Sequence, residues 1–177
     1  VDEMVGRVDK LDARKAINHW KAQGIDFSTL LHRPADSDSV PTYHCNAQDH
    51  GLENALDHKL IELAESALHG NGAVKEQLTI RNANRTVGAM LSGEVAKRYG
   101  EEGLPDDSIH FHLNGTAGQS FGAFLAQGVS LTLEGDANDY MGKGMSGGRL
   151  VVYPPEASTF IPEDNIVTGN VILYGAT

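Results

Sequence analysis

The sequence has little cysteine and no long apolar run. Its single cysteine, Cys45, can neither form an internal disulfide nor hold an iron–sulfur cluster alone, which predicts a cytoplasmic location. No stretch approaches the roughly 20 apolar residues of a membrane span. The acidic first segment, VDEMVGRVDK, predicts no signal peptide, and a start at Val1 indicates a processed or excised fragment. We therefore expect neither a secreted disulfide scaffold nor a membrane protein.

Positive charge is also scarce. Lys and Arg number 14 against 24 Asp and Glu, so the formal net charge is -10. Phosphate backbones and anionic membrane surfaces require a basic surface, so we expect no nucleic acid and no membrane as partners. An acidic surface is typical of a protein kept in solution by its charge. Hydrophobic residues still make up 40% of the chain, which is enough to form a core.

The first half of the chain predicts helices joined by a linker. Asp12 can cap a short helix that ends at Gly24. Residues 28–47 contain two prolines and little periodicity, which predicts a surface loop. Apolar residues recur at helical spacing within 48–72, and a third helix is expected at about 86–99.

From Ile109 onward, short alternating segments separated by glycines predict strands. The segments are IHFHL, VSLTLEG, GRLVVYP and NVILYG, with GAFLA at 122–126 as a shorter candidate. Their inward apolar pairs align as Phe111/Leu113, Leu131/Leu133, Leu150/Val152 and Val171/Leu173. The steps between pairs are 20, 19 and 21 residues, which is a repeat signature, and Leu78/Ile80 in a strand at 77–82 is an earlier candidate member.

A repeat of this length cannot bury its own apolar face, so stacked parallel strands around a shared interior are predicted. We expect a mainly β fold, a parallel β-solenoid over residues 73–177 with the helix near 86–99 inserted. An α-helical lead-in and linker over 1–72 precedes it. Glycines are expected to form the structural turns: Gly115, Gly118, Gly122, Gly128, Gly135, Gly142, Gly144, Gly147 and Gly148. The alternative is an antiparallel sandwich or barrel, in which strands recur every ~8–12 residues.

The segment Gly142–Gly147, GKGMSG, fits the G-x-G-x-x-G pattern of dinucleotide sites. In such sites the glycines follow a strand and open a helix, whose amino terminus holds the pyrophosphate. Here the strand segment RLVVY follows, so a corner between strands is favoured over nucleotide binding. No catalytic or cofactor-binding residue is assigned in the chain.

Two groups of potential metal ligands lack the spacing of a metal site. The spacing of the first group matches no standard zinc pattern, so helix capping and solvated side chains are favoured: His44, Cys45, Asp49, His50 and His58. Asp136, Asn138 and Asp139 are similar to a calcium loop, but the twelfth position is Gly147 instead of glutamate. A turn is the favoured interpretation, and no metal site is expected.

The remaining candidates for chemistry are two histidines and two serines. His110 and His112 alternate with apolar residues on one strand, so both are expected to point away from the interior, and neither has a visible catalytic partner. Ser120 and Ser146 lie outside any G-x-S-x-G sequence, which disfavours acyl-transfer chemistry.

Three stretches together resemble the carboxy-terminal region of the glutamate synthase large subunit. They are DEMVGR at 2–7, QDHGLENALDHKLI at 48–61, and LNGTAGQSFGAFLAQGVSLTLEGDANDYMGKGMSGGRLVVYPPE at 113–156. The third is similar to the GXGXG domain, a right-handed β-helix that also occurs in a formylmethanofuran dehydrogenase subunit and in free-standing proteins. The QDHGL-type helix points to glutamate synthase itself. The resemblance covers essentially the whole chain and implies a right-handed β-helix, truncated at YGAT, where family members continue.

The resemblance implies a non-catalytic structural domain. The family's enzyme makes two glutamates from glutamine, 2-oxoglutarate and reducing equivalents. An amidotransferase domain releases ammonia, and a tunnel leads to a barrel domain that holds FMN and a 3Fe–4S cluster. This chain resembles neither domain. The expected partners are therefore the amidotransferase and FMN-binding domains of the same enzyme, with FMN and the 3Fe–4S cluster held there and no cofactor in this segment.

Two other functions stay open. A stand-alone GXGXG protein would act as a partner-binding subunit, and an enzyme would bind a nucleotide through GKGMSGG. A truncated repeat also leaves strand edges exposed. We therefore expect the isolated fragment to self-associate or to fray near residues 165–177.

Overall fold

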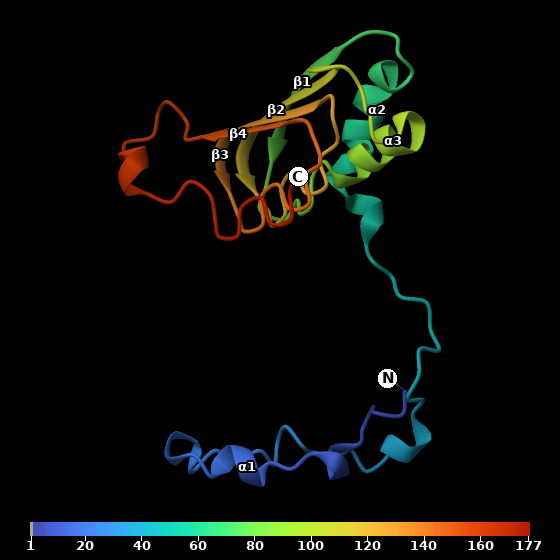
Figure 1. Cartoon of the computed structure of the whole chain (residues 1–177), viewed down its shortest axis with the longest axis vertical. Helices are drawn as coiled ribbons and strands as arrows, with labels where there is room; N and C mark the ends of the chain where they lie inside the picture. The colour runs from blue at the N-terminus through green and yellow to red at the C-terminus, as the bar shows by residue number, and fades with distance from the viewer. Residues whose placement is uncertain (1) are drawn as a thin grey trace. The chain divides into compact units, whose positions relative to one another are not determined.

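The computed structural model describes residues 2–177 (Figure 1). The chain separates into two compact units, Val1–His50 and Gly51–Thr177. Sequence analysis divides the chain elsewhere, between residues 72 and 73.

The first unit has little regular structure. Its elements are the 3₁₀ turns η1 (Val8–Lys10), η2 (Trp20–Ala22) and η3 (Ser37–Ser39) and the helix α1 (Arg14–Ile17). None of its described side chains is buried, and Trp20 is 71% exposed. The expected helix from Asp12 to Gly24 is therefore wrong in its length. A short helix is marginal in water without an apolar face to pack on.

The second unit contains all four strands and both longer helices. Its elements are η4 (Leu52–Asn54), α2 (Leu56–Leu68), β1 (Val74–Ile80), α3 (Ala89–Tyr99), β2 (Ile109–Ala117), β3 (Val129–Ala137), β4 (Arg149–Tyr153) and η5 (Pro162–Asp164). No helix among the described residues combines the length and the apolar character that a membrane span requires.

The helix α2 lies within the segment 48–72 that the periodicity marks, but it is shorter at both ends. Its apolar face buries Leu60, Ala64 and Leu68. Gly51, with φ +61°, and the 3₁₀ turn η4 precede it, and Gly70 follows in a left-handed conformation. The third expected helix is confirmed as α3, which ends at Gly100.

The four strands form one parallel sheet in the order β1-β2-β3-β4. The repeat step fixes the register, because Phe111 pairs with Leu131 and Leu131 pairs with Leu150. The expected parallel pairing is confirmed, and the antiparallel alternative is wrong. The earlier repeat member is displaced by two residues, since Leu113 faces Leu78 and Gly115 faces Ile80.

The expected fold class, a mainly β right-handed β-helix, is wrong. The second unit is a small α/β domain, in which one four-stranded parallel sheet packs with two helices. Figure 1 shows α2 and α3 side by side at one side of the sheet. Their residues Leu60, Leu91 and Val95 belong to the same core as the strand residues. The periodicity could not reveal this class because parallel pairing in a constant register does not determine what covers the sheet.

Two expected strands are absent for a local reason. The segment NVILYG is a turn, in which Val171 and Leu173 have φ values of +58° and +57° and are about half exposed. GAFLA is also irregular, although Phe121, Ala123 and Leu125 in and beside it are fully buried. Both segments are rich in apolar residues like strands, but their backbones leave the extended region at every second residue.

Candidate interaction surface

Three stacked turns form one end of the second unit. We call residues 119–124, 139–144 and 170–175 the turn ladder (Figure 1). Backbone hydrogen bonds join each turn to the next. Ser120 N donates to Asp139 O at 2.8 Å, and Tyr140 N donates to Asn170 O at 2.9 Å. These bonds satisfy backbone groups that would otherwise be exposed or unpaired.

Each turn of the ladder has left-handed residues at alternate positions. In the first turn these are Ser120, Gly122 and Phe124, and in the second they are Tyr140, Gly142 and Gly144. Glycine therefore occupies only some of the positions that favour it. Phe124 occupies the position at which the next turn has Gly144. The residue is 56% exposed, so little burial offsets the conformation of its backbone. A large side chain in the left-handed region carries a steric cost.

The glycines expected at turns lie in several kinds of structure. Gly122, Gly142 and Gly144 lie in the turn ladder, and the backbone immediately before β3 or β4 contains others: Gly128, Gly147 and Gly148. Gly118 directly follows β2. Gly115 and Gly135 lie within β2 and β3 and not at turns.

The segment Gly142–Gly147 does not open a helix. Its first residues belong to the turn ladder, and β4 begins at Arg149 directly after it. A dinucleotide site requires the positive end of a helix at this place. The structure therefore places the segment at the end of the sheet with no helix amino terminus following it.

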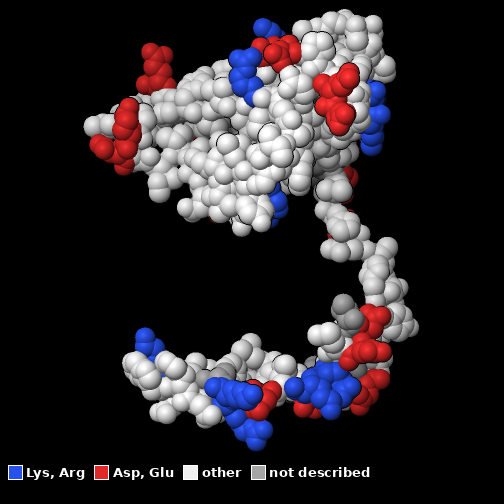
Figure 2. Space-filling model, viewed as in Figure 1, with Lys and Arg blue, Asp and Glu red and all other residues white. Residues whose placement is uncertain are grey.

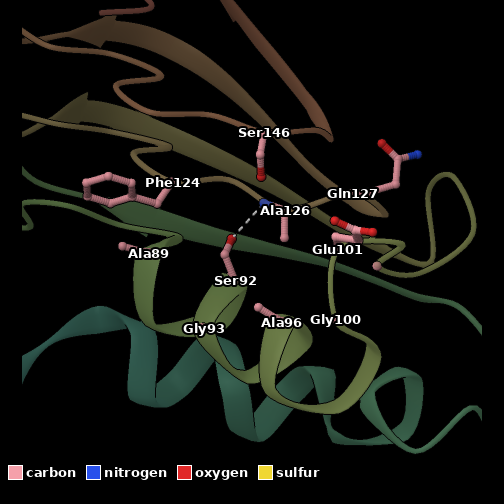
Figure 3. A pocket seen from close by; sticks show the side chains of 11 residues that line it. Ala89, Ser92, Gly93, Ala96, Gly100, Glu101, Phe124, Ala126, Gln127 and Ser146 are labelled. Carbon is pink, nitrogen blue, oxygen red and sulfur yellow. Dashed lines mark hydrogen bonds between the residues drawn. The ribbon is translucent and has the colours of Figure 1, made fainter. Parts of the chain in front are cut away.

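A groove of about 320 Å³ lies between α3 and the loop that leads into β3 (Figure 3). Small residues of α3 form one wall, with Ser92 and Gly93 at its centre. Phe124 lies at one end of the groove, and Glu101 and Gln127 lie at the other. The Ser92 hydroxyl accepts a hydrogen bond from Ala126 N at 3.1 Å, which ties α3 to the loop.

Both predicted outward histidines lie on the outer face of the sheet, which confirms their orientation. Ile109, Phe111 and Leu113 are fully buried, whereas His110 and His112 are half-buried. His110 Nε2 lies 2.9 Å from Thr132 Oγ1. His112 Nε2 is shielded from solvent without a hydrogen bond and lies 3.6 Å from Glu134 Oε2.

Glu134 also connects to a chain of amides on this outer face. Gln77 Nε2 donates to Asn114 Oδ1, and Asn114 Nδ2 donates to Glu134 Oε2, both at 2.8 Å. Tyr153 of β4 contacts the His112 ring edge-on.

The two groups of potential ligands are not assembled into a metal centre. Across residues 2–177, no three His, Cys, Asp or Glu side chains are placed to hold an ion. His58 Nε2 bonds Leu52 O at 2.9 Å. Asp136 accepts from Thr116 Oγ1, and Asp139 Oδ1 accepts from Asn170 N, so these carboxylates stabilise the strand end and the turn ladder.

Sequence reasoning missed Asp57, the most buried carboxylate of the second unit. Its Oδ1 accepts hydrogen bonds from the backbone N–H groups of Gly88, Met90 and Leu91 at 2.9–3.1 Å. Asp57 of α2 thus caps the amino terminus of α3. Burial raises the pKa of its carboxyl, while these hydrogen bonds act in the opposite direction. The sequence signal for the burial of Asp57 is its place on the apolar side of α2, three residues before Leu60.

Charge is distributed unevenly over the second unit. Figure 2 shows its charged side chains in small separate groups, most of them near the edges of this view, with uncharged surface between them. Exposed apolar residues occur at β4 and beyond, among them Val151, Ile166 and Tyr174. Uncharged, partly apolar surface is a feature of protein interfaces.

Comparisons with known proteins give a consistent result. Residues 57–177 match the sequence model of a family described as GXGXG motif. The chain is 53% identical to a glutamate synthase [NADH] of Schizosaccharomyces pombe, over 100% of this chain and 8% of that protein. It is 44% identical to the glutamate synthase [NADPH] large chain of Bacillus subtilis, over 99% of this chain and 11% of that protein. These curated relatives are therefore about ten times longer than the chain.

Proposed function

The chain belongs to the GXGXG motif family, as a GXGXG region of glutamate synthase, and on this basis we propose that it is a non-catalytic structural domain of that enzyme. One observation carries the proposal. The relatives match this chain over its full length, but the match occupies only 8% or 11% of theirs. The chemistry of the enzyme is then assigned to the remainder of the large chain.

The proposed task is to couple glutamine-dependent ammonia release to reductive glutamate formation from 2-oxoglutarate. A parallel sheet braced by the turn ladder and by α2 and α3 supports such a role, because its elements are cross-linked by many backbone hydrogen bonds. A stiff domain in contact with both catalytic domains fixes their distance and orientation. Ammonia then passes between them without loss to solvent.

The residues of this chain do not fit the iron–sulfur cluster of the parent enzyme. A 3Fe–4S cluster is held by several cysteine thiolates, and this chain has only Cys45. We assign the FMN and the cluster to other domains of the large chain, and we derive no reaction step from residues 1–177.

The test uses single substitutions on three exposed faces of the second unit, introduced into the full-length large chain. Phe124→Asp changes the end of the groove, Tyr153→Asp changes the outer sheet face, and Ile166→Asp changes the loop after β4. These side chains are at least 38% exposed, so the domain itself should still fold. Lys59→Glu on α2, whose side chain is 52% exposed, is the matched control.

The measurement is the ratio of glutamine hydrolysed to glutamate formed, together with each half-reaction assayed alone. We expect at least one of the three substitutions to raise this ratio while both half-reactions keep their rates. The scaffold proposal is abandoned if all three variants stay fully coupled, or if the half-reactions fall equally while coupling is preserved. The stand-alone alternative stays a prediction, which the length of the genomic reading frame tests.

A further inference from the structure

The chain contains two Asn-Gly pairs, Asn71–Gly72 and Asn114–Gly115, whose surroundings differ. In such a pair the backbone nitrogen of the glycine can attack the asparagine side chain, because glycine has no Cβ to hinder the approach. The attack requires a glycine nitrogen without a hydrogen bond, a free carboxamide and a backbone that can rotate. The structure meets these conditions at the first pair and restrains the second.

The first pair lies in the exposed turn that joins α2 to β1 (Figure 1). Among residues 2–177, no acceptor takes a hydrogen bond from Gly72 N, and no partner bonds the Asn71 carboxamide. Gly72 has φ +114°, and a Cβ built there would meet no atom within 4 Å. Pairing of β1 with β2 begins only at Val74. The Gly72 nitrogen and the Asn71 carboxamide are therefore free to approach each other.

The second pair lies within β2, where its groups are held. Gln77 Nε2 donates to Asn114 Oδ1, and Asn114 Nδ2 donates to Glu134 Oε2, both at 2.8 Å. Gly115 lies in the parallel ladder between β1 and β3. A rotation that brings its nitrogen to the Asn114 side chain would break these hydrogen bonds and disturb the ladder. The second pair is therefore an internal control for the first.

We propose that Asn71 is a site of spontaneous deamidation, a covalent modification that consumes only water. The Gly72 nitrogen loses its proton to solvent base and forms a bond to Cγ of Asn71. The bond from Cγ to the side-chain nitrogen breaks, and this nitrogen takes protons from solvent and leaves as ammonia. Water then opens the cyclic succinimide at either carbonyl. One product is aspartate, and the other is isoaspartate, in which the main chain passes through the side-chain carbon.

The modification places a negative charge where the fold disfavours one. Asn71 N donates to Ser66 O at 2.9 Å, which closes the last turn of α2. Gly70 N donates to Ala67 O at 3.0 Å in the same turn. The new carboxylate lies at this carboxy-terminal end of the helix, whose partial charge is also negative. Deamidation therefore weakens the end of α2 that leads into β1.

The test incubates the full-length large chain in mildly alkaline buffer and follows the peptides of both Asn-Gly pairs by mass spectrometry. In the folded protein we expect Asn71 to deamidate at least about tenfold faster than Asn114. In urea, where the fold no longer restrains Asn114, the two rates should become similar. Similar rates in the folded protein overturn the proposal. A tenfold difference that persists in urea also overturns it, because the cause would then be the local sequence and not the fold.

Two variants and the identity of the product test the chemistry. Asn71→Gln lengthens the side chain, so the five-membered ring cannot form and the mass gain at position 71 should disappear. Asn54→Gln, at an exposed asparagine followed by Ala55, is the matched control and should leave the rate at position 71 unchanged.

The modified wild type should contain isoaspartate at position 71, which an isoaspartyl methyltransferase labels with a methyl group from S-adenosylmethionine. A mass gain that persists in Asn71→Gln contradicts the assignment to Asn71. Aspartate as the only product would mean direct hydrolysis by water and would exclude attack by Gly72.

Discussion

Gly93 and Gly135 show how one residue type serves opposite purposes. A Cβ at Gly93 meets nothing, whereas a Cβ at Gly135 would lie 1.8 Å from the carbonyl oxygen of Gly115. We therefore expect Gly93→Ala to stabilise the isolated chain by about 0.5–1 kcal/mol and Gly135→Ala to destabilise it by more than that. Urea denaturation measures both. A loss of stability in Gly93→Ala would show that the backbone of α3 needs glycine for its own folding.

Asp57 gives the second unit a pH dependence. Because burial raises the pKa of its carboxyl, the folded chain keeps this proton at pH values where the unfolded chain, with an ordinary Asp pKa of about 4, has lost it. Stability from this group is present below about pH 4 and is lost as pH rises through the folded pKa. Asp57→Asn keeps the Oδ1 acceptor and cannot titrate.

We expect the free energy of unfolding of the wild type, relative to Asp57→Asn, to fall between pH 4 and pH 7. Urea denaturation at several pH values measures the difference. The half-buried Asp107, whose pKa is lowered chiefly by its hydrogen bond from Ser130, contributes the opposite slope, but its contribution is the same in both proteins and cancels in the difference. Parallel stability curves would mean that the carboxylate stays charged in the fold.

At the level of single residues, alternation identified the buried positions of β2 and β3, whereas capping could not be predicted. The buried positions Phe111 and Leu131 followed from the alternation of polar and apolar residues along their strands. The role of Asp57 depends on backbone N–H groups more than 30 residues away. The place of Asp57 on the apolar side of α2 signals its burial, but no local pattern identifies these partners, because the cap and the helix it caps belong to different elements.

At the scale of elements, the turn ladder shows the cost of using ordinary residues in left-handed positions. Val171 is β-branched, has φ +58° and is 46% exposed, so it has steric strain and little burial to offset it. We expect Val171→Asn, which tolerates this conformation, to stabilise the chain by about 1 kcal/mol in urea denaturation. Ile172→Asn, at a neighbour similarly exposed and without positive φ, should give no gain. Equal effects of the two substitutions would exclude strain at Val171 as the cause.

The limits of sequence prediction are also clearest at this scale. The steps of 20 and 19 residues correctly gave the pairing of β2, β3 and β4. The same pattern wrongly made a strand of residues 170–175, since the apolar run at 171–174 is compatible both with an extended strand and with a turn of alternating φ signs. The groove could not be predicted, because it joins α3 to a loop more than 30 residues later in the sequence.

At the scale of the whole molecule, the two units differ in burial, since no described residue of the first unit is buried and the core residues all lie in the second. Every residue from 40 to 54 is exposed, and η4 is the only regular structure in this segment. Exposed, irregular backbone is the preferred site of cleavage. We expect brief treatment with a nonspecific protease to cut within this segment and to leave a stable fragment near Gly51–Thr177. Persistence of the intact chain, or loss of both units at the same rate, would contradict this difference.

The open edge of the sheet has a consequence for the isolated chain. In residues 2–177, β3 is the only strand that pairs with β4, and a cavity of about 570 Å³ beside it is lined by apolar residues such as Met145, Leu150 and Leu173. An unpaired edge beside apolar surface promotes strand pairing between copies.

We expect the isolated chain to form dimers or larger species that increase with concentration in sedimentation experiments. Val151→Lys places a charge on this edge and should shift the equilibrium to monomer, whereas Lys75→Arg on the opposite edge strand should not. A wild-type chain that stays monomeric at high concentration would show that the loop after β4 already shields the edge.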